Sequence, residues 1–113
     1  MHNHDIYGSI IKAIQKKASE ILPSGSQVSL YGSRARGDAR PESDWDLHIL
    51  IQGEDKSQWS QWDKYAWPFE EMGMFEFNET INARLYSFSG WLKRSFLPFY
   101  KNVEHDKIII FQN

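Results

Sequence analysis

The sequence predicts an α+β fold, close to α/β in the alternation of its elements, in which helices flank a small mixed sheet of about four strands. Two patterns predict this fold. In short segments apolar residues recur at every second position, and in longer segments they recur at every third or fourth. The length of 113 residues and the hydrophobic content of 41% fit one domain of ordinary size, so we expect residues 1–113 to form a single domain.

A helix and a short strand begin the chain. Residues 5–22 carry apolar side chains at a spacing of four, which predicts an amphipathic helix, and Pro23 marks its end. Residues 27–31 then predict a strand in which Val28 and Leu30 face the core.

The second strand is predicted at residues 44–51, where apolar and polar side chains alternate. The apolar residues would face the core, and the opposite face would carry Asp44, Asp46 and His48. The histidine has two interpretations: it orients Asp46 or orders water beside it, or it is simply packed within the sheet.

A helix is predicted next, from the stripe of Trp59, Trp62 and Tyr65, and it ends at Pro68. Residues 69–78 have a mixed pattern that fits neither period.

The last part of the chain predicts a strand, a helix and a strand. Residues 81–86 alternate between apolar and polar, which predicts the third strand. Ser87 or Ser89 can cap a helix that Pro98 interrupts, and residues 108–111 form an apolar terminal strand.

Composition excludes several classes of function. The net charge of −2 provides no field to attract a long nucleic acid. The chain has no cysteine, so it has neither a disulfide nor a thiolate zinc site. No segment approaches the roughly 20 apolar residues of a membrane span, and no secretory signal is visible, so we expect a cytoplasmic protein without a membrane partner.

The loop between the first two strands has the residues of a phosphate site. Gly32 allows the backbone to turn sharply and approach a ligand, and Ser33 offers a hydroxyl and an amide where a helical turn would begin. Arg34, Arg36 and Arg40 are candidates to neutralise phosphate, with Arg36 the first choice because of its place in the loop.

Asp44 and Asp46 have the spacing of metal ligands. Two residues apart on a strand, their carboxylates leave the same face with Cα atoms about 6.5–7 Å apart. Mg²⁺ suits such a pair, because it takes few carboxylates and completes its shell with phosphate oxygens and water. Side chains converging from one strand can also bridge two ions.

Residues 32–37 (Gly-Ser-Arg-Ala-Arg-Gly) and 43–47 (Ser-Asp-Trp-Asp-Leu) together resemble the signature of the DNA polymerase β-like nucleotidyltransferase superfamily, and the short chain resembles its minimal single-domain branch. The resemblance implies that a nucleoside monophosphate is transferred from a nucleoside triphosphate to an acceptor hydroxyl with Mg²⁺. ATP is the first candidate for the triphosphate, and a hydroxyl of a partner protein is one candidate acceptor. It also implies that Gly32 and Ser33 hold the triphosphate, while Asp44 and Asp46 bind metal and are catalytic.

One position departs from this resemblance. Active members use a third carboxylate on the strand after the connecting helix, and Asn82 stands at the matching place here, with Arg84 on the same face. The second ion would then bind weakly. Glu76 or Glu79 would substitute if the strand is shifted. The alternative function is therefore a degenerate module, antitoxin-like or regulatory, that binds nucleotide or a partner without turnover.

The aromatic content of 15% exceeds what one small core needs, which indicates an interface. The resemblance adds a candidate partner, since minimal domains of this kind pair with a helical protein of the HEPN type in toxin–antitoxin-like systems. A homodimer is the competing expectation.

Overall fold

The computed structural model describes residues 3–53 and 58–113, and of residues 3–6 and 58–60 it describes only the backbone. The side chain of Trp59, part of the predicted helical stripe, therefore lies outside the described residues. The elements are α1 (Asn3–Ile21), β1 (Gln27–Tyr31), α2 (Ser33–Arg36), β2 (Trp45–Ile51), α3 (Gln58–Tyr65), α4 (Trp67–Met72), the π-helix η1 (Gly73–Phe77), β3 (Ile81–Ser87), α5 (Phe88–Leu92), α6 (Pro98–Asp106) and β4 (Ile108–Gln112).

The four strands form one mixed sheet in the order β3-β2-β1-β4. β1 is antiparallel to both β2 and β4, whereas β2 and β3 are parallel. Because parallel strands need a crossover, α3, α4 and η1 lie between β2 and β3 in the chain. The predicted mixed sheet flanked by helices is confirmed.

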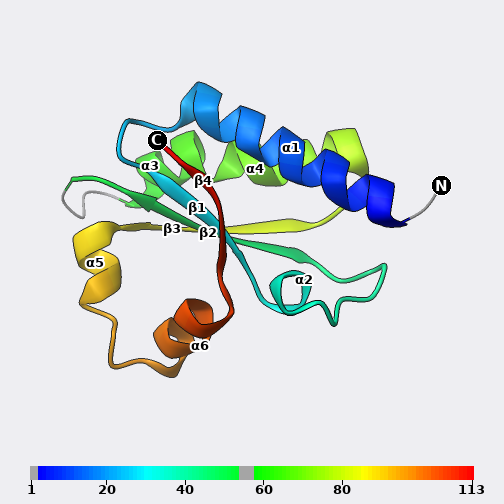
Figure 1. The fold of residues 1–113 in the computed structure, drawn as a ribbon. Helices are drawn as coiled ribbons and strands as arrows, with labels where there is room; N and C mark the ends of the chain where they lie inside the picture. The colour runs from blue at the N-terminus through cyan, green and yellow to red at the C-terminus, as the bar shows by residue number, and fades with distance from the viewer. Residues whose placement is uncertain (1–2, 54–57) are drawn as a thin grey trace.

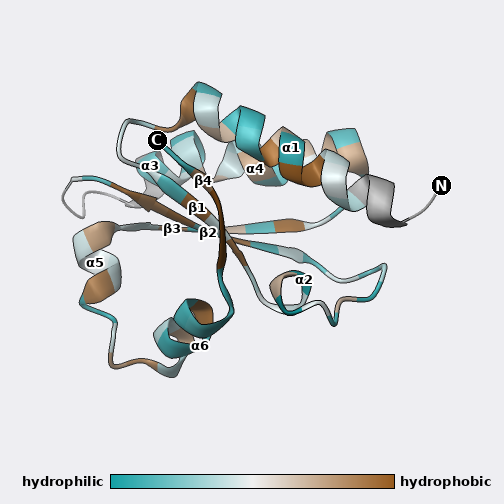
Figure 2. Ribbon diagram, in the orientation of Figure 1, coloured by the Kyte–Doolittle hydropathy of each residue, from teal (hydrophilic) through white to brown (hydrophobic). Residues whose placement is uncertain are grey.

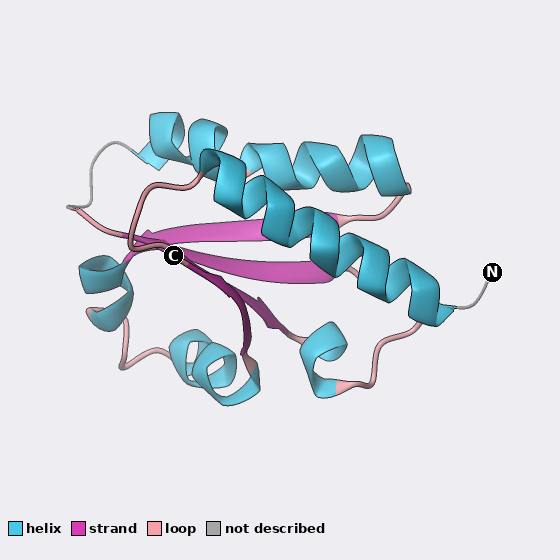
Figure 3. Ribbon diagram, turned by 45° about the horizontal axis from the view of Figure 1, so that its top comes forward, coloured by secondary structure: helices cyan, strands magenta, loops and turns pink. Residues whose placement is uncertain are grey.

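Helices cover both faces of the sheet (Figure 1). α1, α3 and α4 lie on one face, and α2, α5 and α6 lie on the other, as the rotated view in Figure 3 also shows. The larger core is on the α1 side, where Ile10, Ile14 and Ala18 of α1 are fully buried and pack against the apolar face of the sheet. Figure 2 shows the strongest hydrophobic character on the strands.

A smaller core lies on the opposite face. Leu50, Trp91 and Val103 are buried there, with aromatic rings from β1, β3, α5 and α6 packed around them. None of the described helices is both long and apolar enough to cross a membrane.

Residues 69–78, which fit neither period in the sequence, form the end of α4 and the π-helix η1. Gly73 lies at their junction because a Cβ there would meet Ile81 Cγ1 at 2.7 Å. Asn78 ends the segment in the left-handed conformation, with φ of 53°. This irregular helix depends on close packing against β3, a contact that no local pattern in the sequence indicates.

The helix starts near the C-terminus follow the predicted signals. Ser87 accepts a hydrogen bond from the Gly90 amide at 3.0 Å and so caps α5. Pro98 begins the separate helix α6, because a proline in the first turn needs no amide donor.

Candidate functional site

Asp44 and Asp46 converge on a single amide. Asp46 lies in β2 directly opposite Asn82 in the parallel register, and Asp44 lies just before the strand. Asn82 Nδ2 donates to Asp44 Oδ2 at 2.9 Å and to Asp46 Oδ1 at 3.4 Å. The structure therefore brings together both aspartates and the residue at the third position.

The register also locates the two glutamates considered as replacements. Glu76 lies in η1 and Glu79 lies in the short segment between η1 and β3. Neither occupies the strand position that pairs with Asp46, which is held by Asn82.

Asp46 carries its charge at an energetic disadvantage. Burial is the largest cause and raises the pKa of Asp46 above its ordinary value; the hydrogen bond from Asn82 opposes this rise, and the charge of Asp44 adds to it. The more distant guanidinium groups of Arg84 and Arg36 lower the pKa. A cation bound between the two carboxylates would relieve their repulsion.

Gly32 brings the start of α2 against Asp46. Its φ of 73° and ψ of −155° belong to a region that essentially only glycine adopts. A Cβ at this position would lie 2.5 Å from Asp46 Oδ2. Ser33 follows immediately as the first residue of α2, so the turn, the helix start and the carboxylate are packed together.

Arg34 supports the loop between β1 and β2. Its Nη2 atom donates to the carbonyl oxygens of Pro41 at 3.2 Å and Ser43 at 2.9 Å, and its guanidinium lies 4.4 Å from the centre of the Trp45 ring. These contacts hold the segment that carries Asp44, so Arg34 positions the site.

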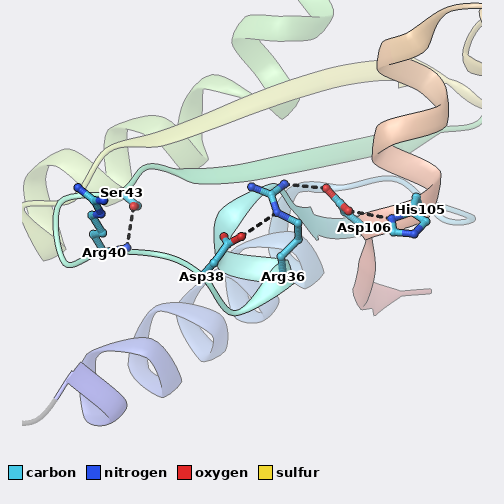
Figure 4. A network of polar contacts seen from close by, with 6 residues as sticks. All are labelled: Arg36, Asp38, Arg40, Ser43, His105 and Asp106. Atoms are coloured by element: carbon cyan, nitrogen blue, oxygen red, sulfur yellow. Dashed lines mark hydrogen bonds and ion pairs between the residues drawn. The ribbon is translucent and has the colours of Figure 1, made fainter.

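Arg36, the first choice for phosphate on sequence grounds, is already paired with two carboxylates (Figure 4). Its Nε atom is 3.2 Å from Asp38 Oδ2, and its Nη1 atom is 2.9 Å from Asp106 Oδ2 on α6. In the same loop the backbone amide of Arg40 donates to Ser43 Oγ at 2.9 Å. Binding of phosphate by Arg36 would require it to exchange these partners.

A groove of about 560 Å³ opens beside β3. Asp46 and Asn82 line it, so it reaches one of the two carboxylates, and Arg84 and Arg94 line it as well. The alternation of β3 indicates the position of Arg84. Arg94 reaches the groove from the turn after α5, which no strand pattern predicts.

His48 is packed within the smaller core. It is fully buried, and its ring centre lies 4.1 Å from that of Trp91 and 5.5 Å from that of Tyr86. Burial lowers the pKa of His48 to about 4, and the charge of Lys107 adds to this shift. Neither ring nitrogen has a hydrogen-bond partner among the residues that the structure describes, which favours the packed histidine over one that orients Asp46.

The amino-acid sequence matches the family of nucleotidyltransferase domains over residues 11–112. The chain belongs to this family. The match spans all four strands of the sheet, and it includes the turn at Gly32 and both aspartates of this nucleotidyltransferase domain.

Solved structures share the fold of this nucleotidyltransferase domain. A toxin–antitoxin structure with AMP-PNP has a TM-score of 0.61 at 13% identity, covering 91% of this chain and 73% of the other. A Sulfolobus solfataricus protein described as a nucleotidyltransferase has a TM-score of 0.65 at 16% identity, with coverages of 96% and 86%. A mutant MntA–HpeT toxin–antitoxin structure has a TM-score of 0.60 at 11% identity, with coverages of 91% and 73%.

At identities this low, the structural similarity shows a common fold. This fold confirms the predicted nucleotidyltransferase architecture. No curated protein sequence matches the chain.

Proposed function

We propose that this domain binds a Mg²⁺–nucleoside triphosphate and transfers the nucleoside monophosphate to an acceptor hydroxyl. ATP is the first candidate for the triphosphate. The observation that supports this most is the convergence of Asp44 and Asp46 beside the Gly32 turn. In the reaction, the acceptor oxygen forms a bond to the α-phosphorus and the bond from that phosphorus to the bridging oxygen breaks. Pyrophosphate leaves, and the hydroxyl proton passes to solvent.

Two carboxylates that share one side of the sheet fit a hard cation with oxygen ligands. Asp44 and Asp46 would hold it, and Mg²⁺ when bound would neutralise phosphate charge as pyrophosphate leaves. Asn82 now donates its amide NH₂ to both aspartates, but a rotation of the amide would present its oxygen instead. A neutral oxygen is a weaker ligand than a carboxylate, so a second ion would bind weakly.

The triphosphate would contact the opposite side of the carboxylate pair from β3. Gly32 would allow the close approach, and the Ser33 hydroxyl would donate to a phosphate oxygen. Arg36 would assist only after phosphate displaces Asp38 and Asp106, so its contribution depends on the strength of those two ion pairs. The pair with Asp38 is exposed and easily exchanged, whereas the Asp106 side chain is only 11% exposed, so the pair with Asp106 is harder to displace.

A second candidate is a module that binds nucleotide or a partner without turnover. Asn82 favours it, because the acceptor hydroxyl has no carboxylate base at that position. Similarity to the toxin–antitoxin structures favours a partner protein, for which we propose a helical HEPN-type chain, with a homodimer as the competing assembly. Phe75 and Phe96 are 75% and 74% exposed and would contribute to such an interface. We further propose that residues 1–113 act as a single cytoplasmic domain.

Calorimetric titration with Mg²⁺–AMP-PNP tests the nucleotide site. We expect binding by the parent protein that disappears when EDTA removes the metal, and loss of binding in the Asp44→Asn/Asp46→Asn double variant. Glu42→Gln, which removes an exposed carboxylate from the same loop, should bind like the parent. Unchanged affinity in the double variant would disprove the metal assignment.

A transfer assay separates the two candidates. With ATP labelled on the α-phosphate, we expect slow or absent transfer by the isolated chain, and faster transfer by Asn82→Asp. Rapid transfer by the parent that is insensitive to Glu76→Gln and Glu79→Gln would contradict the need for a third carboxylate. Loss of transfer in either glutamate variant would assign the missing carboxylate to that residue.

A further inference from the structure

A second cavity, of about 340 Å³, is lined by residues of β1, β2, α5 and α6 and lies on the same sheet face as the smaller core. Leu50 lines it and is four residues beyond Asp46 on β2, which corresponds to about 13 Å along the strand. His48, packed against Trp91, lies between these two positions. The cavity is therefore separate from the proposed nucleotide site.

Apolar side chains form much of the wall of this cavity. Phe88 and Trp91 of α5 contribute aromatic rings, and Leu50 and Leu92 contribute aliphatic side chains. Small-molecule sites are commonly concave, mostly apolar and roughly 300–1,000 Å³ in volume. This cavity is at the lower end of that range, so its size fits a ligand with a single ring.

Gln27 places an unpaired acceptor in the wall. Its residue is only 8% exposed, and its Oε1 atom has no hydrogen-bond partner among the residues that the structure describes. A buried acceptor without a partner costs free energy, because it has lost its hydrogen bonds to water. A ligand with an N–H donor would supply the missing partner.

The charges that line the cavity compensate each other. Glu104 Oε2 accepts from Lys107 Nζ and from Trp91 Nε1, each at 2.9 Å. Burial opposes ionisation of this carboxyl, but the two hydrogen bonds outweigh it and lower the pKa of Glu104. An anionic ligand would be repelled by Glu104 and a cationic one by Lys107, which favours a neutral ligand. The ammonium of Lys107 has further donors that a ligand carbonyl can accept.

We propose that this cavity is a binding site for a neutral aromatic carboxamide. The ring would pack against Trp91 and Phe88, the amide N–H would donate to Gln27 Oε1, and the amide carbonyl would accept from Lys107. Neither nucleotidyl transfer nor a partner protein is needed for this site, so the inference stands independently of both.

NMR titrations of the whole chain with benzamide test the site, because they measure millimolar affinities and locate the bound probe. We expect a saturable shift of the Trp91 indole N–H resonance, which the Trp91→Phe variant assigns. The indole N–H of Trp62, which donates to Ala83 outside this cavity, should not shift. Saturating Mg²⁺–AMP-PNP should leave the affinity for benzamide unchanged, since the two sites are separate.

Related probes and variants test the chemistry of recognition. N,N-dimethylbenzamide lacks the N–H donor and should bind about tenfold more weakly than benzamide. Gln27→Met removes the acceptor and should abolish this difference, whereas Gln61→Met, the same change on α3 outside the cavity, should preserve it. Benzoate and benzylamine should both bind more weakly than benzamide. In Lys107→Gln, which leaves Glu104 without its cation, benzylamine should bind at least as tightly as benzamide.

Several results would overturn the proposal. One is the absence of a saturable shift at Trp91. Another is equal affinity of the parent for benzamide and N,N-dimethylbenzamide, which would mean that water satisfies Gln27. A third is a tenfold difference that persists in Gln27→Met. Tighter binding of uridine than of benzamide would assign the cavity to a nucleobase instead. Should Gln27→Met fail to fold, the two amides compared in the parent still decide the outcome.

Discussion

The two ends of one sheet face are built in opposite ways. At one end Asp44, Asp46 and Asn82 are accessible, and one weak and one good hydrogen bond connect them. At the other end His48 and Trp91 are buried among aromatic rings from four elements. A single polar alternation along β2 supplies both ends, because residues 44, 46 and 48 share a face.

This contrast indicates which part of the face contributes stability. The closed end buries large rings, whereas the accessible end holds a carboxylate whose charged form is disfavoured by burial. Sites that bind charged ligands commonly carry such a disadvantage, which the ligand then relieves. Four substitutions or conditions test this contrast.

Removal of Trp91 should have the largest effect on the closed end. Trp91 is 4% exposed, and its Nε1 atom donates to Glu104 at 2.9 Å. Trp91→Ala should lower the free energy of unfolding by about 3–5 kcal/mol, measured by urea denaturation. Phe96→Ala, which truncates a residue that is 74% exposed, is the control and should change stability by less than about 0.5 kcal/mol. Similar losses in both variants would contradict the contrast.

Acid should destabilise the closed end through His48. The pKa of its imidazole is about 4 in the folded chain and 6.5 ordinarily, so between these values the unfolded chain takes up a proton that the folded chain does not. Stability should therefore fall by up to about 3 kcal/mol as pH decreases from 6.5 to 4. In His48→Leu, denaturation curves across this range should show a smaller fall. An equal fall in both proteins would show that other groups cause it.

Gly32 should be more sensitive than Gly37, although both have positive φ. A Cβ at Gly37 meets nothing within 4 Å, whereas a Cβ at Gly32 collides with Asp46. Gly37→Ala should lose about 1–2 kcal/mol from backbone strain alone. Gly32→Ala should lose more and should also displace Asp46, so calorimetry should show weaker Mg²⁺–AMP-PNP binding only in this variant. Equal nucleotide affinity in the two variants would contradict the role of the Gly32 contact.

Asp46→Asn should have the smallest effect on stability, and its sign should differ from that of the other substitutions. Because burial raises the pKa of Asp46, its charge opposes folding as pH rises above the ordinary value of 3.8. Thermal denaturation at pH 7 should show an unchanged or higher Tm, while Mg²⁺–AMP-PNP binding is lost. A clearly lower Tm would show that the carboxylate stabilises the fold.

Three strands were predicted from their period of two and the last from its apolar run, and the period places Asn82 on the sheet face that the structure shows beside Asp46. It did not predict that Arg36 is paired with Asp106, since these residues are 70 positions apart and meet only when α2 and α6 are folded. The position of Arg94 in the groove was not predicted from the sequence either, because the turn after α5 determines the direction of this side chain. The π-helix was not predicted, because it depends on the contact between Gly73 and Ile81, which the local sequence does not indicate.

The parallel pairing of β2 with β3 has a consequence for how the site forms in time. Asp46 and Asn82 are separated by 36 residues, whereas Gly32 and both aspartates lie in the antiparallel pair β1–β2 or in the segment that connects its strands. Local pairing closes a short loop and forms early, but the parallel pair must wait for the whole crossover to close. We therefore expect a newly folding chain to bring its two carboxylates together before the amide and the arginine join them.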